Sequence, residues 1–181
     1  PSCHQLEAIE WIIGNGASGT INNMKTPNFE NFLGKHIKEF NIIENATIKH
    51  DSIFNTYVIH SEKKYDFFGN TYNGYTVSVN NKNIVNDITL YINKIIDSSF
   101  YDNFTSEYGI PNETKVGGSR VVKKEKFKDD LSTEIKETNI SLKKGSFDEK
   151  PHLIKWYKEN YEIQIFIKRE INITEIKFSL K

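Results

Sequence analysis

The pattern of apolar and polar positions predicts a helix near the start of a first folded segment. Apolar residues recur at helical spacing after Thr26-Pro27, which offers a capping hydroxyl and a residue suited to the first helical position. The apolar face comprises Phe29, Phe32, Leu33, His36, Ile37 and Phe40. A stripe of this kind indicates an amphipathic helix packed on a core.

From Ala46 to Ile96 the apolar period changes to two, which is typical of strands. Tyr57 and Ile59 indicate one strand, and residues 65–68 indicate a second. Tyr75, Val77 and Val79 then alternate with polar residues, a turn rich in Asn follows, and residues 84–92 return as a strand. Together these strands predict an antiparallel meander.

A second segment repeats this order. Asp97 or Ser98 can cap a helix in which Phe100, Phe104 and Tyr108 share one face, and Gly109 ends it. Residues 115–145 are highly charged with short alternating patches, which predicts an extended hairpin. Two strongly alternating strands over residues 161–167 and 173–180 close the chain.

The repeated order predicts an internal duplication. Tyr161 lies 86 residues after Tyr75, and Gly109 lies 75 residues after Gly34, so the second copy carries about ten extra residues, which fit within 115–145. The alternative is that any two meanders align this loosely. We therefore expect an α+β fold of tandem helix-plus-antiparallel-meander units, with few helices on one sheet face. The predicted parts are an N-terminal segment and linker (1–25), a first unit (26–96) and a second unit (97–181) containing the hairpin insertion.

The helix ends Leu33-Gly34-Lys35 and Tyr108-Gly109-Ile110-Pro111, each followed by an aromatic-led hairpin, resemble the β-lactamase-inhibitor-protein architecture and the small outer-membrane lipoproteins of the SmpA type. Those proteins pack a short helical segment against an antiparallel sheet, sometimes in tandem. The resemblance covers residues 27–181 in element order, and the paired cysteines of the family are missing here. It implies a protein that binds other proteins and catalyses nothing.

Charge and cysteine content restrict the function further. The 24 basic and 24 acidic residues balance, which disfavours nucleic acid as a partner. Cys3 is the only cysteine, and Pro1-Ser2-Cys3 resembles the end of a bacterial lipobox. Cys3 is therefore either a lipidation site, which would be the one link to a membrane, or a solitary thiol. Because the chain begins with Pro, we expect that a preceding segment has been removed.

Candidate catalytic motifs are weak. Gly14-Asn15-Gly16-Ala17-Ser18-Gly19 matches a dinucleotide-binding pattern, but the residues that follow make a poor helix, so a linker is the better interpretation. His50-Asp51-Ser52 has the residue types of a catalytic triad, yet three adjacent residues cannot orient one another as a relay. None of the five histidines forms a metal-type pair. We expect no catalytic residue, no metal and no cofactor.

Two aromatic clusters provide the predicted partner-binding residues. Strand alternation should turn about half of these rings away from the helix-covered face, where exposed aromatics serve as interface anchors. The alternative is that they cover the other sheet face or lie under the hairpin. The residues are Tyr65, Phe67, Phe68, Tyr72 and Tyr75 in the first unit and Trp156 and Tyr157 in the second.

These observations predict a non-enzymatic protein-binding module, most concretely a bacterial inhibitor or toxin-immunity protein. We expect it in the cell envelope or secreted, or in the cytoplasm if it is an immunity protein that is not exported. One alternative is an enzyme or small-ligand carrier with a site assembled from His60, Glu62, Asp66 and Tyr75. Another alternative is a structural lipoprotein of the envelope.

Overall fold

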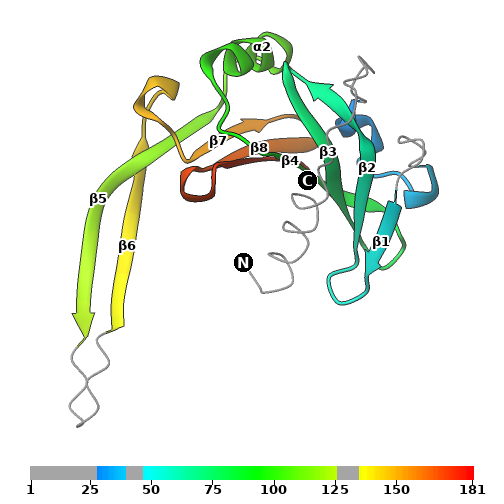
Figure 1. Cartoon of the computed structure of the whole chain (residues 1–181), viewed down its shortest axis with the longest axis horizontal. Coiled ribbons are helices and arrows are strands. Elements are labelled where there is room, and N and C mark those ends of the chain that lie inside the picture. Colours follow the sequence, from blue (N-terminus) through cyan, green and yellow to red (C-terminus); the bar gives the residue numbers. More distant parts are fainter. Residues whose placement is uncertain (1–27, 40–46, 126–134) are drawn as a thin grey trace.

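The computed structural model describes residues 28–39, 47–125 and 135–181, which form a nine-stranded antiparallel sheet with one α-helix on one face (Figure 1). The strand order is β1-β2-β3-β4-β9-β8-β7-β5-β6. The strands are β1 (Thr47–Asp51), β2 (Thr56–Phe67), β3 (Asn70–Val79), β4 (Val85–Ile92), β5 (Glu113–Glu125), β6 (Ile135–Lys144), β7 (Leu153–Tyr157), β8 (Tyr161–Lys168) and β9 (Ile173–Leu180). The helix is α2 (Ser98–Tyr108), and the 3-10 turns are η1 (Phe29–Phe32), η2 (Ile37–Glu39), η3 (Phe147–Glu149) and η4 (Arg169–Ile171). The N-terminal segment, Cys3 and the glycine-rich motif lie outside the described residues.

Helix α2 forms where the sequence predicts it. The Asp97 side chain accepts a hydrogen bond of 2.9 Å from the backbone N–H of Phe100, which caps the first turn. Gly109 ends the helix with a φ of +78°, a conformation that glycine adopts without steric cost. Phe100, Phe104 and Tyr108 are buried against the sheet. Capping and apolar spacing thus suffice to place this helix.

The helix predicted after Thr26-Pro27 is wrong. Residues 29–39 form two 3-10 turns, because Gly34 has a φ of +78° and breaks the helical path. The backbone then bonds to the turn between β3 and β4: Gly34 N–H donates to Val85 at 2.9 Å, and Ile37 N–H donates to Asn83 at 2.9 Å. Phe29 still reaches the core and is 1% exposed. Phe32, Leu33 and Ile37 are partly buried against the core, and Phe40 lies outside the described residues.

The first meander contains one long strand where the sequence predicts two. The patches around Tyr57 and Tyr65 both belong to β2, which pairs with β3 along its length. Between His60 and Tyr65 the register with β3 shifts. This irregularity interrupts the alternation of side chains and makes the strand look like two in the sequence.

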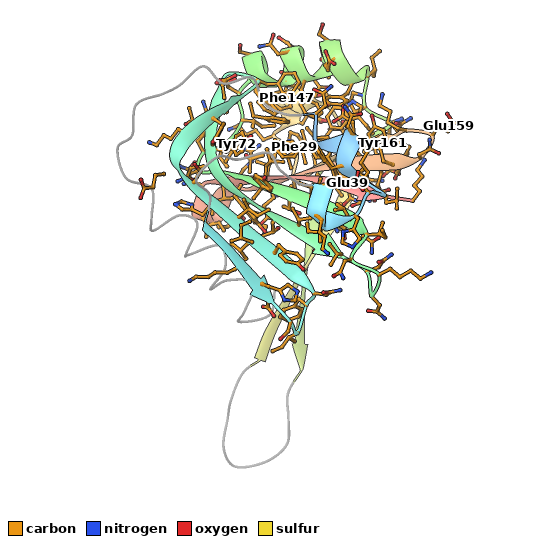
Figure 2. The ribbon with its side chains drawn as sticks, turned by 90° about the vertical axis from the view of Figure 1, so that its right-hand side faces the viewer. Phe29, Glu39, Tyr72, Phe147, Glu159 and Tyr161 are labelled. Atoms are coloured by element: carbon orange, nitrogen blue, oxygen red, sulfur yellow. The ribbon has the colours of Figure 1, made fainter. Side chains whose placement is uncertain are left out.

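The β4–β9 ladder joins the two predicted units into one sheet. Ile88 pairs with Phe178, and Leu90 pairs with Ile176. These residues, with Ile163 of β8, are fully buried on the face that α2 covers. Figure 2 shows the side chains that fill the space between α2 and the sheet, with Phe29 and Tyr72 among them. The core of the molecule lies in this layer.

Strands β5 and β6 form a hairpin, here called the arm, that projects from the sheet (Figure 1). Within the described residues, β5 pairs with β7 only over Glu113–Lys115, and its remainder pairs with β6 alone. A bulge lies between Gly117 and Arg120. A Cβ on Gly118 would lie 2.7 Å from Ser141 Oγ, so the bulge requires glycine there. This is the hairpin that the charged segment predicts.

Candidate functional site

Most of the aromatic residues expected at a partner surface are buried instead. Five of the seven are at most 3% exposed: Tyr65, Phe67, Tyr72, Tyr75 and Trp156. Phe68 is half-buried and packs on Phe104, with ring centroids 5.1 Å apart. Tyr157 is 40% exposed. The expectation that about half of these rings are accessible is therefore wrong, although the structure does bring the first-unit rings together.

The register shift in β2 explains this burial. Under strict alternation, Tyr72 and Tyr75 would point to opposite faces of β3, because they are three residues apart. Both rings instead contact Phe29, with centroid distances of 6.1 Å and 5.4 Å. The irregularity between His60 and Tyr65 turns the end of the β2–β3 hairpin toward the core. A period-two pattern cannot show this turn.

The accessible surface is the sheet face opposite α2, here called the open face. In β4, Ile88 and Leu90 are on the covered face, so Asp87, Thr89 and Tyr91 point to the other side. Cross-strand register extends this face over β9, β8, β7 and the first residues of β5. Its members there are Leu153, Lys155, Tyr157, Glu162, Gln164, Phe166, Lys168, Glu175, Lys177, Ser179, Glu113 and Lys115. The sequence contains the pattern that predicts this face, since each of these residues alternates along its strand with a core position.

The charges of the open face are balanced and largely paired. Lys177 Nζ lies 3.2 Å from Asp87 Oδ1, and Lys168 forms an ion pair with Glu175. Lys115 Nζ lies 3.4 Å from Glu113 Oε2. With Lys155 and Glu162 added, the face carries four amines and four carboxylates. A surface of this kind has no net attraction for a polyanion.

Two tyrosines give the open face neutral hydrogen-bonding groups. Tyr157 donates a hydrogen bond of 2.7 Å to Glu113 Oε1, which raises the pKa of the Tyr157 phenol and lowers the pKa of the Glu113 carboxyl. Burial raises the pKa of Tyr91 to about 12, and its hydroxyl lies 3.4 Å from Thr76 Oγ1. Both phenols are therefore protonated at neutral pH and cannot act as bases. Amphipathic rings of this kind are typical of binding surfaces.

The four residues of the alternative ligand site do not converge. His60 pairs with Gly74, so it lies on the opposite side of the sheet from the neighbouring Tyr75, which is 1% exposed in the core. Asp66 accepts a hydrogen bond from the Gly69 N–H at 3.3 Å within the β2–β3 turn, and Glu62 is exposed.

Two hollows lie elsewhere on the surface of the described residues. One, of about 310 Å³, is lined by Ile37, Ile48, Tyr57 and neighbours near β1. The other, of about 610 Å³, lies between α2, the base of the arm and η3, where Tyr101 and Phe147 stack with centroids 4.3 Å apart. Neither is lined by His60 or Asp66.

Metal-ligating side chains are dispersed in the part of the chain that the structure describes, where no three of them gather as a metal site would require. No helix among the described residues is long and apolar enough to cross a membrane. Comparisons with protein-family models, curated proteins and solved structures find no match to the chain.

Proposed function

We propose that this protein is a non-enzymatic binding module that holds another protein against the open face and the arm. The observation that carries the proposal is the arm, whose strands of 13 and 10 residues project from the sheet beyond the pairing of Glu113–Lys115 with β7. A hairpin with two strands is marginally stable in water, because each strand has one unpaired edge and little apolar surface is buried. A partner packed on the arm would supply the missing contacts.

The most concrete version is a bacterial inhibitor or toxin-immunity protein, in the envelope or secreted, with Cys3 as a lipid anchor where the chain is exported. The open face supports a protein as the partner. It presents paired charges around half-buried Tyr91 and Phe166, together with the exposed Tyr157. Interfaces between proteins combine aromatic anchors with satisfied polar groups in this way.

The proposal includes the internal duplication of the scaffold. Two features support it. Strands β4-β3-β2 and β9-β8-β7 follow one another outward from the β4–β9 ladder in the same order. Gly34 and Gly109, which occupy matching places before the two meanders, have the same φ of +78°. A duplicated unit would give the partner one continuous surface built from both copies.

Affinity capture tests this function. The full chain is used as bait against the envelope and secreted fractions of its source organism, beside a Tyr157→Ala/Lys155→Ala variant on the open face. The matched control is Asn103→Ala/Glu107→Ala on the exposed side of α2. We expect a stoichiometric protein retained by the wild type and the control but reduced about tenfold or more for the open-face variant. Absence of such a protein, together with turnover of a small substrate by the purified chain, would contradict the proposal.

A further inference from the structure

The hollow of about 610 Å³ beside α2, here called the helix hollow, contains a pair of stacked aromatic rings. Tyr101 of α2 and Phe147 of η3 have ring centroids 4.3 Å apart and ring planes inclined by 15°. Figure 1 shows η3, in yellow-orange, at the base of the arm and level with α2, and Figure 2 shows Phe147 beside the helix. Both rings are half-buried, so the stack keeps part of its surface accessible to a ligand.

The wall formed by η3 is fixed to the sheet. The Ser146 N–H donates a hydrogen bond of 3.0 Å to Glu149 Oε2 in a capping box, and the Gly145 N–H donates one of 3.0 Å to the Thr114 carbonyl oxygen. A Cβ on Gly145 would lie 2.7 Å from Val116 Cγ1, so the chain passes here only as glycine. The hollow is therefore formed before any ligand arrives, which lowers the entropic cost of binding.

The rim of the hollow carries an apolar side chain that is held out in solvent. Ile110 is 89% exposed. The backbone on both sides of it is bound to β7: the Gly109 carbonyl oxygen accepts a 2.7 Å hydrogen bond from Trp156, and the Asn112 N–H donates one of 2.9 Å to the Lys155 carbonyl oxygen. The exposure of Ile110 therefore belongs to a fixed loop, as an apolar contact for a partner requires.

The hollow has a surplus of negative charge. Asp102 and Asp148 line it, and within the described residues neither carboxylate forms an ion pair. Burial, followed by these two carboxylates, raises the pKa of the Tyr101 phenol, so both charges lie near its ring. Lys144 is the only amine among the lining residues. Two carboxylates against one amine favour a cation.

A buried hydroxyl lines the same hollow. Thr114 is 8% exposed and alternates with Glu113 and Lys115 of the open face, so its side chain is on the α2 side of β5. Its hydroxyl has no hydrogen bond to another described residue. It can therefore accept a hydrogen bond from an N–H donor of a bound group.

An anion fits the helix hollow less well, although the first turn of α2 borders it at Ser98. The Asp97 side chain already accepts a hydrogen bond from the Phe100 N–H, so this donor of the first turn is occupied. An anion would also lie near two carboxylates with one amine to offset them.

We propose that the helix hollow receives an arginine side chain of the partner protein, with its guanidinium on the aromatic stack and within reach of the two carboxylates. This inference rests on the proposed function and gives the partner a chemistry. A guanidinium stacks flat on aromatic rings and presents five N–H donors, whereas an ammonium is compact and strongly hydrated. The residues that flank the arginine would contact Ile110 and Pro111 at the rim.

Peptide binding to the full chain tests the selectivity of the hollow. The probe is an acetylated pentapeptide amide, Gly-Leu-Arg-Leu-Gly, and the comparison peptides carry citrulline, lysine or glutamate at the centre. Backbone amide shifts in NMR spectra report the affinity and the place of binding. We expect the arginine peptide to bind about tenfold more tightly than the citrulline peptide, which has the same shape without the charge. The lysine peptide should be intermediate, and the glutamate peptide should bind most weakly.

Matched double variants isolate the carboxylates. Asp102→Asn/Asp148→Asn should weaken binding of the arginine peptide about five- to tenfold. Glu107→Gln/Glu159→Gln removes the same charge from exposed positions outside the hollow and should change the affinity less than about twofold. Lys144→Gln should strengthen binding about twofold, because it removes the one positive charge of the lining.

Phe147→Leu tests the aromatic stack separately. It keeps an apolar side chain of similar size but removes the ring, so it should weaken the arginine peptide about threefold and reduce its advantage over the citrulline peptide. Urea unfolding of every variant verifies that the sheet and η3 remain folded.

Three outcomes of the peptide series would overturn the proposal. Equal weakening by both double variants would mean that net charge alone governs binding. Tightest binding of the glutamate peptide, lost in Lys144→Gln, would make the hollow an anion site. Binding of free N-acetylarginine amide as tightly as the pentapeptide would make the occupant a small molecule and not a protein segment.

The capture experiment separates this inference from the proposed function. A protein captured by the wild type should be retained about fivefold less by Asp102→Asn/Asp148→Asn. If that variant retains the partner fully, the hollow assignment fails while the proposed function stands. Self-association of the chain that the same variant abolishes would make a second copy the occupant and overturn a separate partner. If no protein is captured, the proposed function fails together with the partner's arginine, whereas the peptide series still decides whether the hollow selects a guanidinium.

Discussion

The indole Nε1 of Trp156 donates a hydrogen bond of 2.7 Å to the backbone carbonyl oxygen of Gly109, which connects β7 to the end of α2. Trp156 is 1% exposed, and its ring lies 5.0 Å from that of Phe104. Lys158 Nζ donates a hydrogen bond of 2.5 Å to the carbonyl oxygen of Tyr108. Two carbonyls that the helix end leaves without intrahelical partners are thus satisfied from β7 and the residue after it.

We expect Trp156→Phe to lower the free energy of unfolding by about 2–4 kcal/mol, because it leaves the Gly109 carbonyl unsatisfied and creates a cavity. Urea unfolding followed by circular dichroism measures the change. Tyr157→Phe is the neighbouring control: it removes an exposed hydrogen bond to Glu113 and should change the free energy of unfolding much less than Trp156→Phe does. Equal costs for the two variants would show that the bond to Gly109 has no structural role.

Gly34→Ala and Gly109→Ala should each cost about 1–2 kcal/mol, because both residues have a φ of +78°. A Cβ at Gly34 would meet Leu180 Cδ1 at 3.8 Å, and at Gly109 nothing lies within 4 Å, so the cost is conformational in both cases. Gly117→Ala is the control, since its nearest contact, His152 Nε2 at 3.4 Å, is ordinary. Thermal unfolding of the three variants would refute this account if Gly117→Ala were the most damaging.

Phe104→Ala should destabilise the protein by about 3–5 kcal/mol. Phe104 is 0% exposed, and its ring contacts those of Phe68, Tyr108 and Trp156 from α2 and both halves of the sheet. Asn103→Ala, one residue earlier on the exposed side of α2, should change stability by less than about 0.5 kcal/mol. Chemical denaturation distinguishes these values readily. A loss below 1 kcal/mol for Phe104→Ala would contradict the packing of α2 on this sheet.

Tyr91 should make the protein less stable in alkali. Its pKa is raised by burial from 10.0 to about 12 in the folded chain, so the unfolded chain loses its proton first. The stability linked to this phenol is complete below about pH 10 and is lost as pH rises through 12, a fall of roughly 2–3 kcal/mol. Tyr91→Phe should therefore show a shallower alkaline decline than the wild type in urea unfolding measured from about pH 9 to about pH 12. If the free energy of unfolding fell equally steeply with pH in both proteins, the predicted burial of the Tyr91 phenol would be wrong.

The sequence predicts correctly those elements whose determinants lie within the element itself or directly beside it. Asp97, the apolar spacing from Phe100 to Tyr108 and Gly109 determine α2 without help from the rest of the chain. The segment after Pro27 has equally good apolar spacing, but its backbone bonds to the turn between β3 and β4, which lies about fifty residues further along the chain. No local pattern contains that information.

The predicted exposure of the aromatic residues is wrong for a similar reason. Alternation assigns sides of a strand correctly only while the register holds, and it does not hold between His60 and Tyr65. The aromatic rings are therefore buried in the core. The open face is formed instead by less conspicuous residues such as Lys155, Gln164 and Lys177. The sequence predicts that these residues lie on the open face as soon as the core residues with which they alternate are known to face α2.

The pairing of β4 with β9 has a consequence for the kinetics of folding. Ile88 and Phe178 are 90 positions apart, whereas β2, β3 and β4 are joined by short turns. Closing so long a loop is entropically unfavourable until each meander has formed, so we expect this ladder to assemble after the local hairpins. Until then the edges of β4 and β9 remain unpaired, and the chain passes through a stage in which its most apolar strands are its most vulnerable to aggregation.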